Sequence, residues 1–171
     1  MLLLACGAHT ARADDTLDQL FARLKLAPDE ATARDLENDI WEYWTTPEDP
    51  ALKAAMTRVL QYMRWQEFTE AETLLNDIIA KWPAYAEAWN QRATVHFLRG
   101  DYEQSLEDIA ETLAREPRHF GAMAGRAVIR LRQAKPALAR QTVLEALKIH
   151  PWLRERQMFP DLAPPPNAAP Q

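Results

Sequence analysis

The side chains that most often carry out chemistry are sparse along this chain of 171 residues. It has a single cysteine, Cys6, and no segment rich in glycine that could cradle a phosphate. Its histidines have no metal-ligand spacing. They are His9, His96, His119 and His150. The sequence therefore predicts no cofactor and no metal ion.

Carboxylates are plentiful, but their positions are those of solvated side chains. Acidic residues near helix starts and on polar helical faces are explained by the helix dipole and by hydration, so they need no acid–base role. The residues in question are Glu67, Glu70, Glu103, Glu107 and Glu111. We therefore expect a protein that is not an enzyme. The alternative is an enzyme, or an obligate enzyme subunit, whose site forms at an interface with a partner.

The elements that would position any site are set by a long repeat in the sequence. Pro83, Pro117 and Pro151 are evenly spaced, and each closes a segment with helical spacing of apolar residues. A fixed period of about 34 residues is typical of stacked helix pairs, which bury their apolar faces only against neighbouring pairs. The three repeating segments are residues 52–85, 86–119 and 120–153.

The middle segment shows how one unit folds. Trp89, Ala93 and Phe97 recur every four residues and share one helical face, so Trp89 is expected in the core. Gly100 can adopt the left-handed conformation that ends a helix, and Asp101 can cap the next helix.

These positions resemble those of the tetratricopeptide repeat. The second segment matches at nearly every diagnostic position, whereas the first has Gln66 in place of the turn glycine and the third has Met123 in place of an aromatic residue. His96 stands where the family usually has an aromatic residue, so we expect a packed core histidine. The resemblance, to small exported bacterial members in particular, implies an all-α, right-handed superhelical stack of antiparallel helix pairs.

Both ends of the stack depart from the repeat. Residues 14–51 have two short apolar stripes, which predict an atypical N-terminal helix pair that covers one end, or else a degenerate fourth repeat. Residues 154–158 could form a short cap, so that residues 14–158 make one domain. Residues 159–171 are rich in proline and predict a disordered tail.

In this family the first helix of each unit lines a concave groove, and the resemblance implies that this groove binds a peptide or a partner protein. The family's lysine, asparagine and arginine clamp for chaperone termini is missing, so shape and apolar contact should dominate recognition. The positions carried over are Lys53, Met56, Leu60, Met63, Arg64, Glu87, Asn90, Thr94, Phe97, Leu98, Gly121, Ala124, Val128, Leu131 and Arg132. The implied function is a non-catalytic adaptor of the bacterial cell envelope.

Charge limits the class of partner. The formal net charge is −5, whereas a surface that binds nucleic acid is expected to carry a basic stripe. We therefore expect a protein or peptide partner and no nucleic acid. The sequence does not indicate an oligomeric state.

The first thirteen residues resemble an export signal without its basic front. Residues 2–8 are apolar, and the small residues Ala11 and Ala13 precede Asp14 as in a signal-peptidase site. This pattern predicts cleavage between Ala13 and Asp14 and a periplasmic protein. The alternative is a cytoplasmic protein with an apolar N-terminus.

Cys6 leaves a third localisation open. The residues around Cys6 resemble a bacterial lipoprotein box, in which the cysteine is lipidated and tethers the protein to a membrane. Contact with a membrane is expected only in this case.

Overall fold

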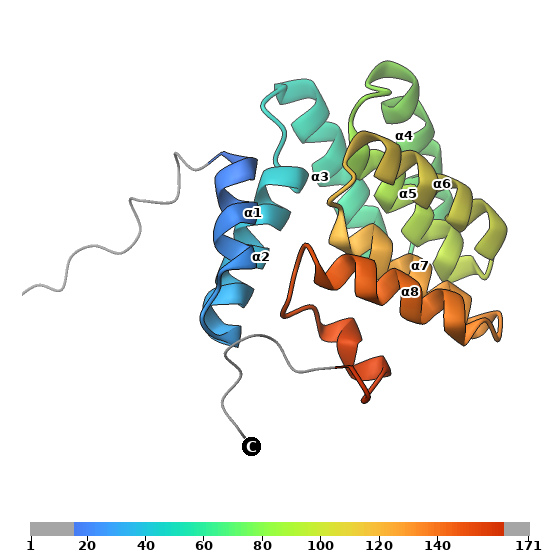
Figure 1. The fold of residues 1–171 in the computed structure, drawn as a ribbon. Coiled ribbons are helices and arrows are strands. Elements are labelled where there is room, and N and C mark those ends of the chain that lie inside the picture. Colours follow the sequence, from blue (N-terminus) through green and yellow to red (C-terminus); the bar gives the residue numbers. More distant parts are fainter. Residues whose placement is uncertain (1–15, 163–171) are drawn as a thin grey trace, which may run out of the picture.

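The computed structural model describes residues 16–162, which form eight α-helices and one 3₁₀ helix (Figure 1). Within these residues the chain is all-helical, as the sequence predicts. The helices are α1 (Leu17–Lys25), α2 (Glu30–Thr45), α3 (Pro50–Arg64), α4 (Phe68–Lys81), α5 (Ala86–Arg99), α6 (Tyr102–Arg115), α7 (Phe120–Arg132), α8 (Pro136–Leu147) and the 3₁₀ helix η1 (Arg154–Met158). The predictions on Cys6, Ala13 and Asp14 lie outside the described residues.

Helices α3 to α8 form three antiparallel pairs that stack in chain order (Figure 1). Each pair turns through a residue with positive φ. Gly100 has φ +87°, which confirms the predicted left-handed turn, and Gln66 and Ala134 take the same position in the other two units with φ +60° and +56°. The turn geometry therefore repeats even where glycine does not.

Polar and proline residues fix several helix starts. The side chain of Asp29 accepts a hydrogen bond from the Thr32 amide at 2.8 Å and so caps the start of α2. Pro136 stands in the first turn of α8, where its missing amide leaves no hydrogen bond unmade. The predicted cap at Asp101 is wrong: its side chain makes no capping hydrogen bond. Its ψ of 63° departs from the extended backbone that a capping residue needs.

Each pair buries an apolar seam, but Trp89 lies at its edge. Its indole packs against the cluster that contains Val59, Leu75 and Val95, and it is half-buried rather than enclosed. The guanidinium groups of Arg92 and Arg115 lie 5.0 and 4.4 Å from the centre of its ring. The expectation that Trp89 is a core residue therefore holds only in part, because the ring is half-buried.

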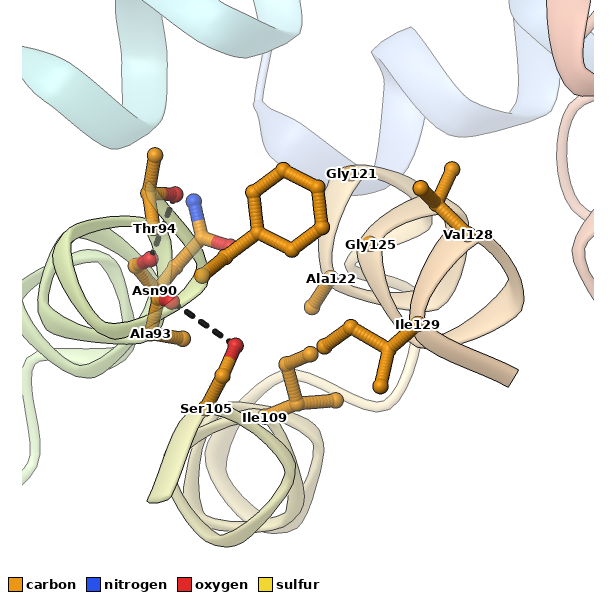
Figure 2. A pocket seen from close by; sticks show the side chains of 11 residues that line it. Asn90, Ala93, Thr94, Ser105, Ile109, Gly121, Ala122, Gly125, Val128 and Ile129 are labelled. Carbon is orange, nitrogen blue, oxygen red and sulfur yellow. Dashed lines mark hydrogen bonds between the residues drawn. The ribbon is translucent and has the colours of Figure 1, made fainter. Parts of the chain in front are cut away.

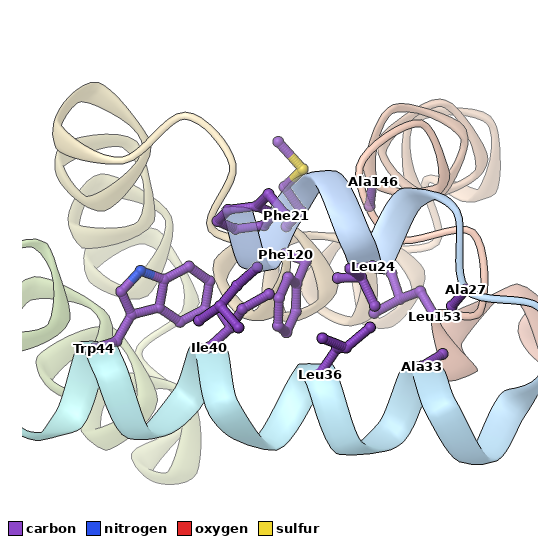
Figure 3. Packing of buried hydrophobic residues seen from close by; sticks show 12 residues of the cluster. Phe21, Leu24, Ala27, Ala33, Leu36, Ile40, Trp44, Phe120, Ala146 and Leu153 are labelled. Carbon is purple, nitrogen blue, oxygen red and sulfur yellow. The ribbon is translucent and has the colours of Figure 1, made fainter. Parts of the chain in front are cut away.

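The N-terminal pair α1–α2 does not pack onto α3, as a cap of the first unit would. Its buried side chains join Phe120, Met123, Ala146 and Leu153 of the third unit (Figure 3). Trp152 also donates a hydrogen bond to the carbonyl of Ala27 at 3.1 Å. The apolar side chains of the pair are therefore buried mainly against the third unit.

The beginning of the predicted tail is ordered against the third unit. Phe159 and Leu162 fall in the segment that the proline pattern predicts to be disordered, but they pack against the cluster formed by Ala127, Ala139 and Val143. Asp161 accepts an ion-paired hydrogen bond from Arg140 at 2.9 Å. These contacts correct the boundary, since the proline pattern alone did not reveal the two apolar residues as anchors.

Candidate binding site

A pocket lies where α5, α6 and α7 meet (Figure 2). Its volume is about 140 Å³. The first helices of units two and three, α5 and α7, supply most of its wall. The lining residues are Asn90, Ala93, Thr94, Phe97, Ser105, Ile109, Gly121, Ala122, Gly125, Val128 and Ile129.

Small residues create the space. Ala93 and Ala122 are buried residues of its wall, and Gly125 leaves room beside Ile109. A methyl group added at Gly125 would lie 3.6 Å from the Ile109 Cδ1 atom, which is ordinary van der Waals contact. The pocket therefore exists because α7 carries glycine where a larger residue would fit.

The polar groups in the wall are already paired. Ser105 Oγ donates to the Ala93 carbonyl at 2.7 Å, and Thr94 Oγ1 donates to the Asn90 carbonyl at 3.0 Å (Figure 2). The Asn90 side chain donates to Glu87 at 3.1 Å. A group entering the pocket meets satisfied hydroxyls and aliphatic carbon, so the site favours an apolar group.

The predicted groove positions divide into three groups. Five line the pocket: Asn90, Thr94, Phe97, Gly121 and Val128. Eight lie elsewhere and are exposed or half-buried: Lys53, Leu60, Met63, Arg64, Leu98, Ala124, Leu131 and Arg132. The predictions for Met56 and Glu87 are wrong, because their exposed fractions are 0% and 1%.

The two errors have different physical causes. Met56 packs with Val59 and Leu75 inside the first unit, so its side chain faces the paired helix. Glu87 instead accepts hydrogen bonds from Asn90 and Gln91 and contacts His119 Nε2 at 3.0 Å. Both side chains are committed to the interior and cannot contact a ligand.

Helix α2 occupies part of the surface that the resemblance assigns to a ligand. Trp44 stacks on His119 with ring centres 4.0 Å apart, and Trp41 lies against Gly121. The hydroxyl of Tyr85 donates a hydrogen bond to the Trp44 carbonyl, and burial raises the pKa of this hydroxyl, which keeps it a donor. The chain's own helix therefore covers the N-terminal ends of α5 and α7.

The structure pairs three histidines with carboxylates, and none of the three pairs was predicted from the sequence. His119 and Glu87 are almost fully buried, with exposed side-chain fractions of 0% and 1%. Because His119 and Glu87 are shielded from solvent and lie between helices, they form a structural link and are not accessible acid–base groups. The pairs are His96–Asp108 at 3.5 Å, His119–Glu87 at 3.0 Å and His150–Glu37 at 3.3 Å.

His96 is a packed core histidine, as expected, with an exposed fraction of 6%. Its partner Asp108 also holds Arg92 through two hydrogen bonds of 2.8 and 2.7 Å, and these raise the pKa of Arg92. His96 and Asp108 stand at equal distances in the sequence on either side of Tyr102, at the turn of the helix pair. That symmetry was a usable signal, since residues equidistant from a turn face each other across a hairpin.

The third pair joins distant parts of the chain. Glu37 on α2 meets His150, which follows α8, and the hydrogen bond from His150 lowers the pKa of Glu37. Because the two partners lie near opposite ends of the described chain, nothing in the local sequence pattern indicated this contact.

The described part of the chain lacks two further features, a metal-ligand group and a membrane-spanning helix. Residues 16–162 contain no group of three potential ligands that could hold a metal ion. None of their helices has the length and apolar content needed to cross a membrane.

Comparison with known proteins agrees with this geometry. The chain matches the tetratricopeptide repeat family over residues 57–111 and 99–151. It is 35% identical over 141 residues to a TPR repeat-containing protein of Rhizobium etli, a match that covers 82% of this chain and 69% of the relative. The chain therefore belongs to the tetratricopeptide repeat family.

Solved structures of MamA share the fold. One is 17% identical with a TM-score of 0.54, and the match covers 77% of this chain and 74% of that one. A second is 18% identical with the same TM-score and covers 88% and 77% of the two chains. Membership of the family supports the assignment of this chain as a protein–protein interaction module. Members of this family are typically non-catalytic scaffolds.

Proposed function

We propose that this protein is a non-catalytic adaptor that binds a partner protein or peptide across the inner helices α5 and α7. The observation that carries the proposal is the apolar pocket between these helices, whose wall includes five of the positions implied by the family resemblance. An exposed apolar residue, Leu98, lies on the same helix as Thr94 and Phe97 of the wall, with an exposed fraction of 51%. An accessible apolar site on a repeat scaffold supports recognition of another chain.

We further propose that the protein works in the bacterial cell envelope after export to the periplasm. The support is the sequence of residues 1–13, with its apolar run and the small residues before Asp14. Fractionation of cells that express the full chain, followed by N-terminal sequencing of the product, tests this. A mature N-terminus at Asp14 in the periplasmic fraction is expected, and an intact chain in the cytoplasm would contradict it.

The binding proposal is tested by ranking variants for retention of the partner. A tagged full chain and its variants are crosslinked in the expressing cells, and the retained protein is quantified by mass spectrometry. Phe97→Ala should reduce retention more than Lys53→Glu or Arg64→Glu, because the site is apolar. Circular dichroism of each variant confirms that the fold is kept. If the two charge reversals had the larger effect, the groove would work by electrostatics and the proposal would be wrong.

A further inference from the structure

We propose that the pocket between α5 and α7 receives one aromatic or leucine side chain of the partner, from a segment that carries a carboxylate next to this side chain for Arg132. This proposal rests on the proposed function, because it names the chemistry that the same site recognises. It commits to a peptide segment with an apolar anchor and an acidic neighbour.

The size of the pocket sets the size of the anchor. A cavity of about 140 Å³ is close to that of engineered apolar cavities of roughly 150 Å³, which stay dry and bind benzene. The pocket therefore accommodates a single benzene-sized or branched aliphatic group. The pocket is too small for an indole ring or for two side chains at once.

The wall selects an apolar group over a polar one. None of the eleven described residues that line the pocket is charged. The hydroxyls of Ser105 and Thr94 are spent on backbone carbonyls, so a polar group in the pocket would lose its hydration without gaining a partner. The anchor is therefore a hydrocarbon side chain.

The charge beside the pocket selects what flanks the anchor. The Arg132 guanidinium lies 5.0 Å from the ring centre of Phe97, which lines the pocket, and it donates to the hydroxyl of Tyr102 at 3.0 Å. This arginine is exposed and is held in place by neutral aromatic groups. A carboxylate on the partner complements it, and such a charge-assisted hydrogen bond fixes the orientation of the segment.

Two small probes separate the contribution of apolar contact to binding from the contribution of the charge. 3-Phenylpropionate carries a phenyl ring and a carboxylate, and 3-phenylpropanamide is its neutral match. Both are titrated into the full-length protein while methyl NMR signals of Ala93, Ala122 and Val128 are followed. Both probes should shift these signals, and the carboxylate should bind about threefold more tightly, the size of an exposed ion pair.

Variants on α7 then assign each contribution. Gly125→Leu fills the pocket and should weaken both probes about tenfold or more, whereas Ala54→Leu on the exposed face of α3 should not. Gly125→Ala, whose added methyl makes only ordinary contact, covers the case in which the leucine variant fails to fold. It should weaken both probes to a smaller extent. Arg132→Gln should remove the preference for the carboxylate, and Arg130→Gln on the same helix should keep it.

The results that would contradict this inference differ from those that would contradict the proposed function. Probes that leave the pocket signals unmoved, or that bind Gly125→Leu and Gly125→Ala as tightly as wild type, would overturn the assignment of the pocket. Equal binding of acid and amide would overturn the carboxylate. If a partner is retained through α5 and α7 but 3-phenylpropionate does not compete with it, the adaptor function stands and this inference fails.

Discussion

Gln66 and Ala134 carry a conformational cost that Gly100 avoids. All three residues close the turn of a helix pair with positive φ, but only glycine does so without strain from a Cβ atom. The repeat therefore demands the left-handed conformation even where the residue opposes it. The sequence showed the missing glycine at Gln66 but not that the turn keeps its geometry without one.

Gln66→Gly should therefore stabilise the protein. We expect the free energy of unfolding to rise by about 0.5–1 kcal/mol, because the strain at φ +60° is relieved. Gly100→Ala is the opposite substitution and should lower the free energy of unfolding by about 1 kcal/mol. Urea unfolding measures both variants, with Gln66→Ala as a neutral control. A loss of stability in Gln66→Gly would show that the glutamine side chain contributes more than the turn strain costs.

Glu37 should make the fold sensitive to acid. Its pKa is lowered in the folded protein, chiefly by the hydrogen bond from His150. A carboxyl group whose folded pKa lies below its unfolded pKa stabilises the fold above the unfolded value, and this contribution is lost as the pH falls through the folded one. Below pH 4.5, the ordinary pKa of glutamate, wild type should therefore lose stability more steeply than Glu37→Gln.

The matched control for this experiment is Glu42→Gln, an exposed residue on the same helix. It should keep the wild-type pH slope. Thermal unfolding from pH 3, about one unit below the usual carboxyl pKa values, to pH 7, about half a unit above the usual histidine pKa, gives the slopes. Equal slopes for wild type and Glu37→Gln would mean that the His150 contact contributes nothing to the docking of α2.

At the scale of elements, the two glycines of α7 have opposite roles. A Cβ atom at Gly121 would lie 2.5 Å from the Trp41 ring of α2, whereas at Gly125 it would make ordinary contact. Gly121 therefore allows α2 to approach, and Gly125 leaves the pocket open. Their spacing in one helix was visible in the sequence, but the need for Gly121 depends on a helix from the N-terminal part of the chain.

Gly121→Ala should loosen the N-terminal pair. We expect a loss of about 1–3 kcal/mol in stability from overpacking against Trp41. Gly125→Ala should instead gain about 0.5–1 kcal/mol from the better helix propensity of alanine. Hydrogen exchange of the α1 and α2 amides, with urea unfolding alongside, reports both. Faster exchange in Gly125→Ala than in Gly121→Ala would contradict this account of the interface.

For the whole molecule, the period predicted the stack but not how its ends close. The three helix pairs, their turns and their core faces follow from residues that recur at the same position of each unit. The docking of α1–α2 on the third unit depends on contacts such as Trp44 with His119, which link segments far apart in the chain. Local periodicity contains no information on such contacts.

Gln61 carried a sequence signal that the first helix of the stack, α3, is left uncovered. Gln61, Val95 and Ile129 occupy the same position in the three successive units. Val95 and Ile129 are fully buried where the preceding unit packs on α5 and α7, whereas Gln61 is exposed on α3. A polar residue at this repeat position indicates that no helix covers α3, and it argued against placing α1–α2 there.

The candidate site was predictable in outline only. The family resemblance pointed to two of the helices that line the pocket and to five of its residues, but it also included Met56 and Glu87, whose side chains are buried by contacts that the pattern does not specify. The pocket itself arises from small residues on three helices that meet only in the folded stack. Its volume and paired hydroxyls therefore required the structure.

The measurement that tests the central claim most directly is site-specific photocrosslinking in the expressing cells. A photoreactive phenylalanine analogue replaces Leu98, which is exposed on α5, or Glu107, which is exposed on the second helix α6. We expect a discrete protein adduct at Leu98 that is lost when Gly125→Leu fills the pocket, and none at Glu107. An adduct at Glu107 alone, or an adduct at Leu98 that is unchanged by Gly125→Leu, would contradict binding through the pocket between α5 and α7.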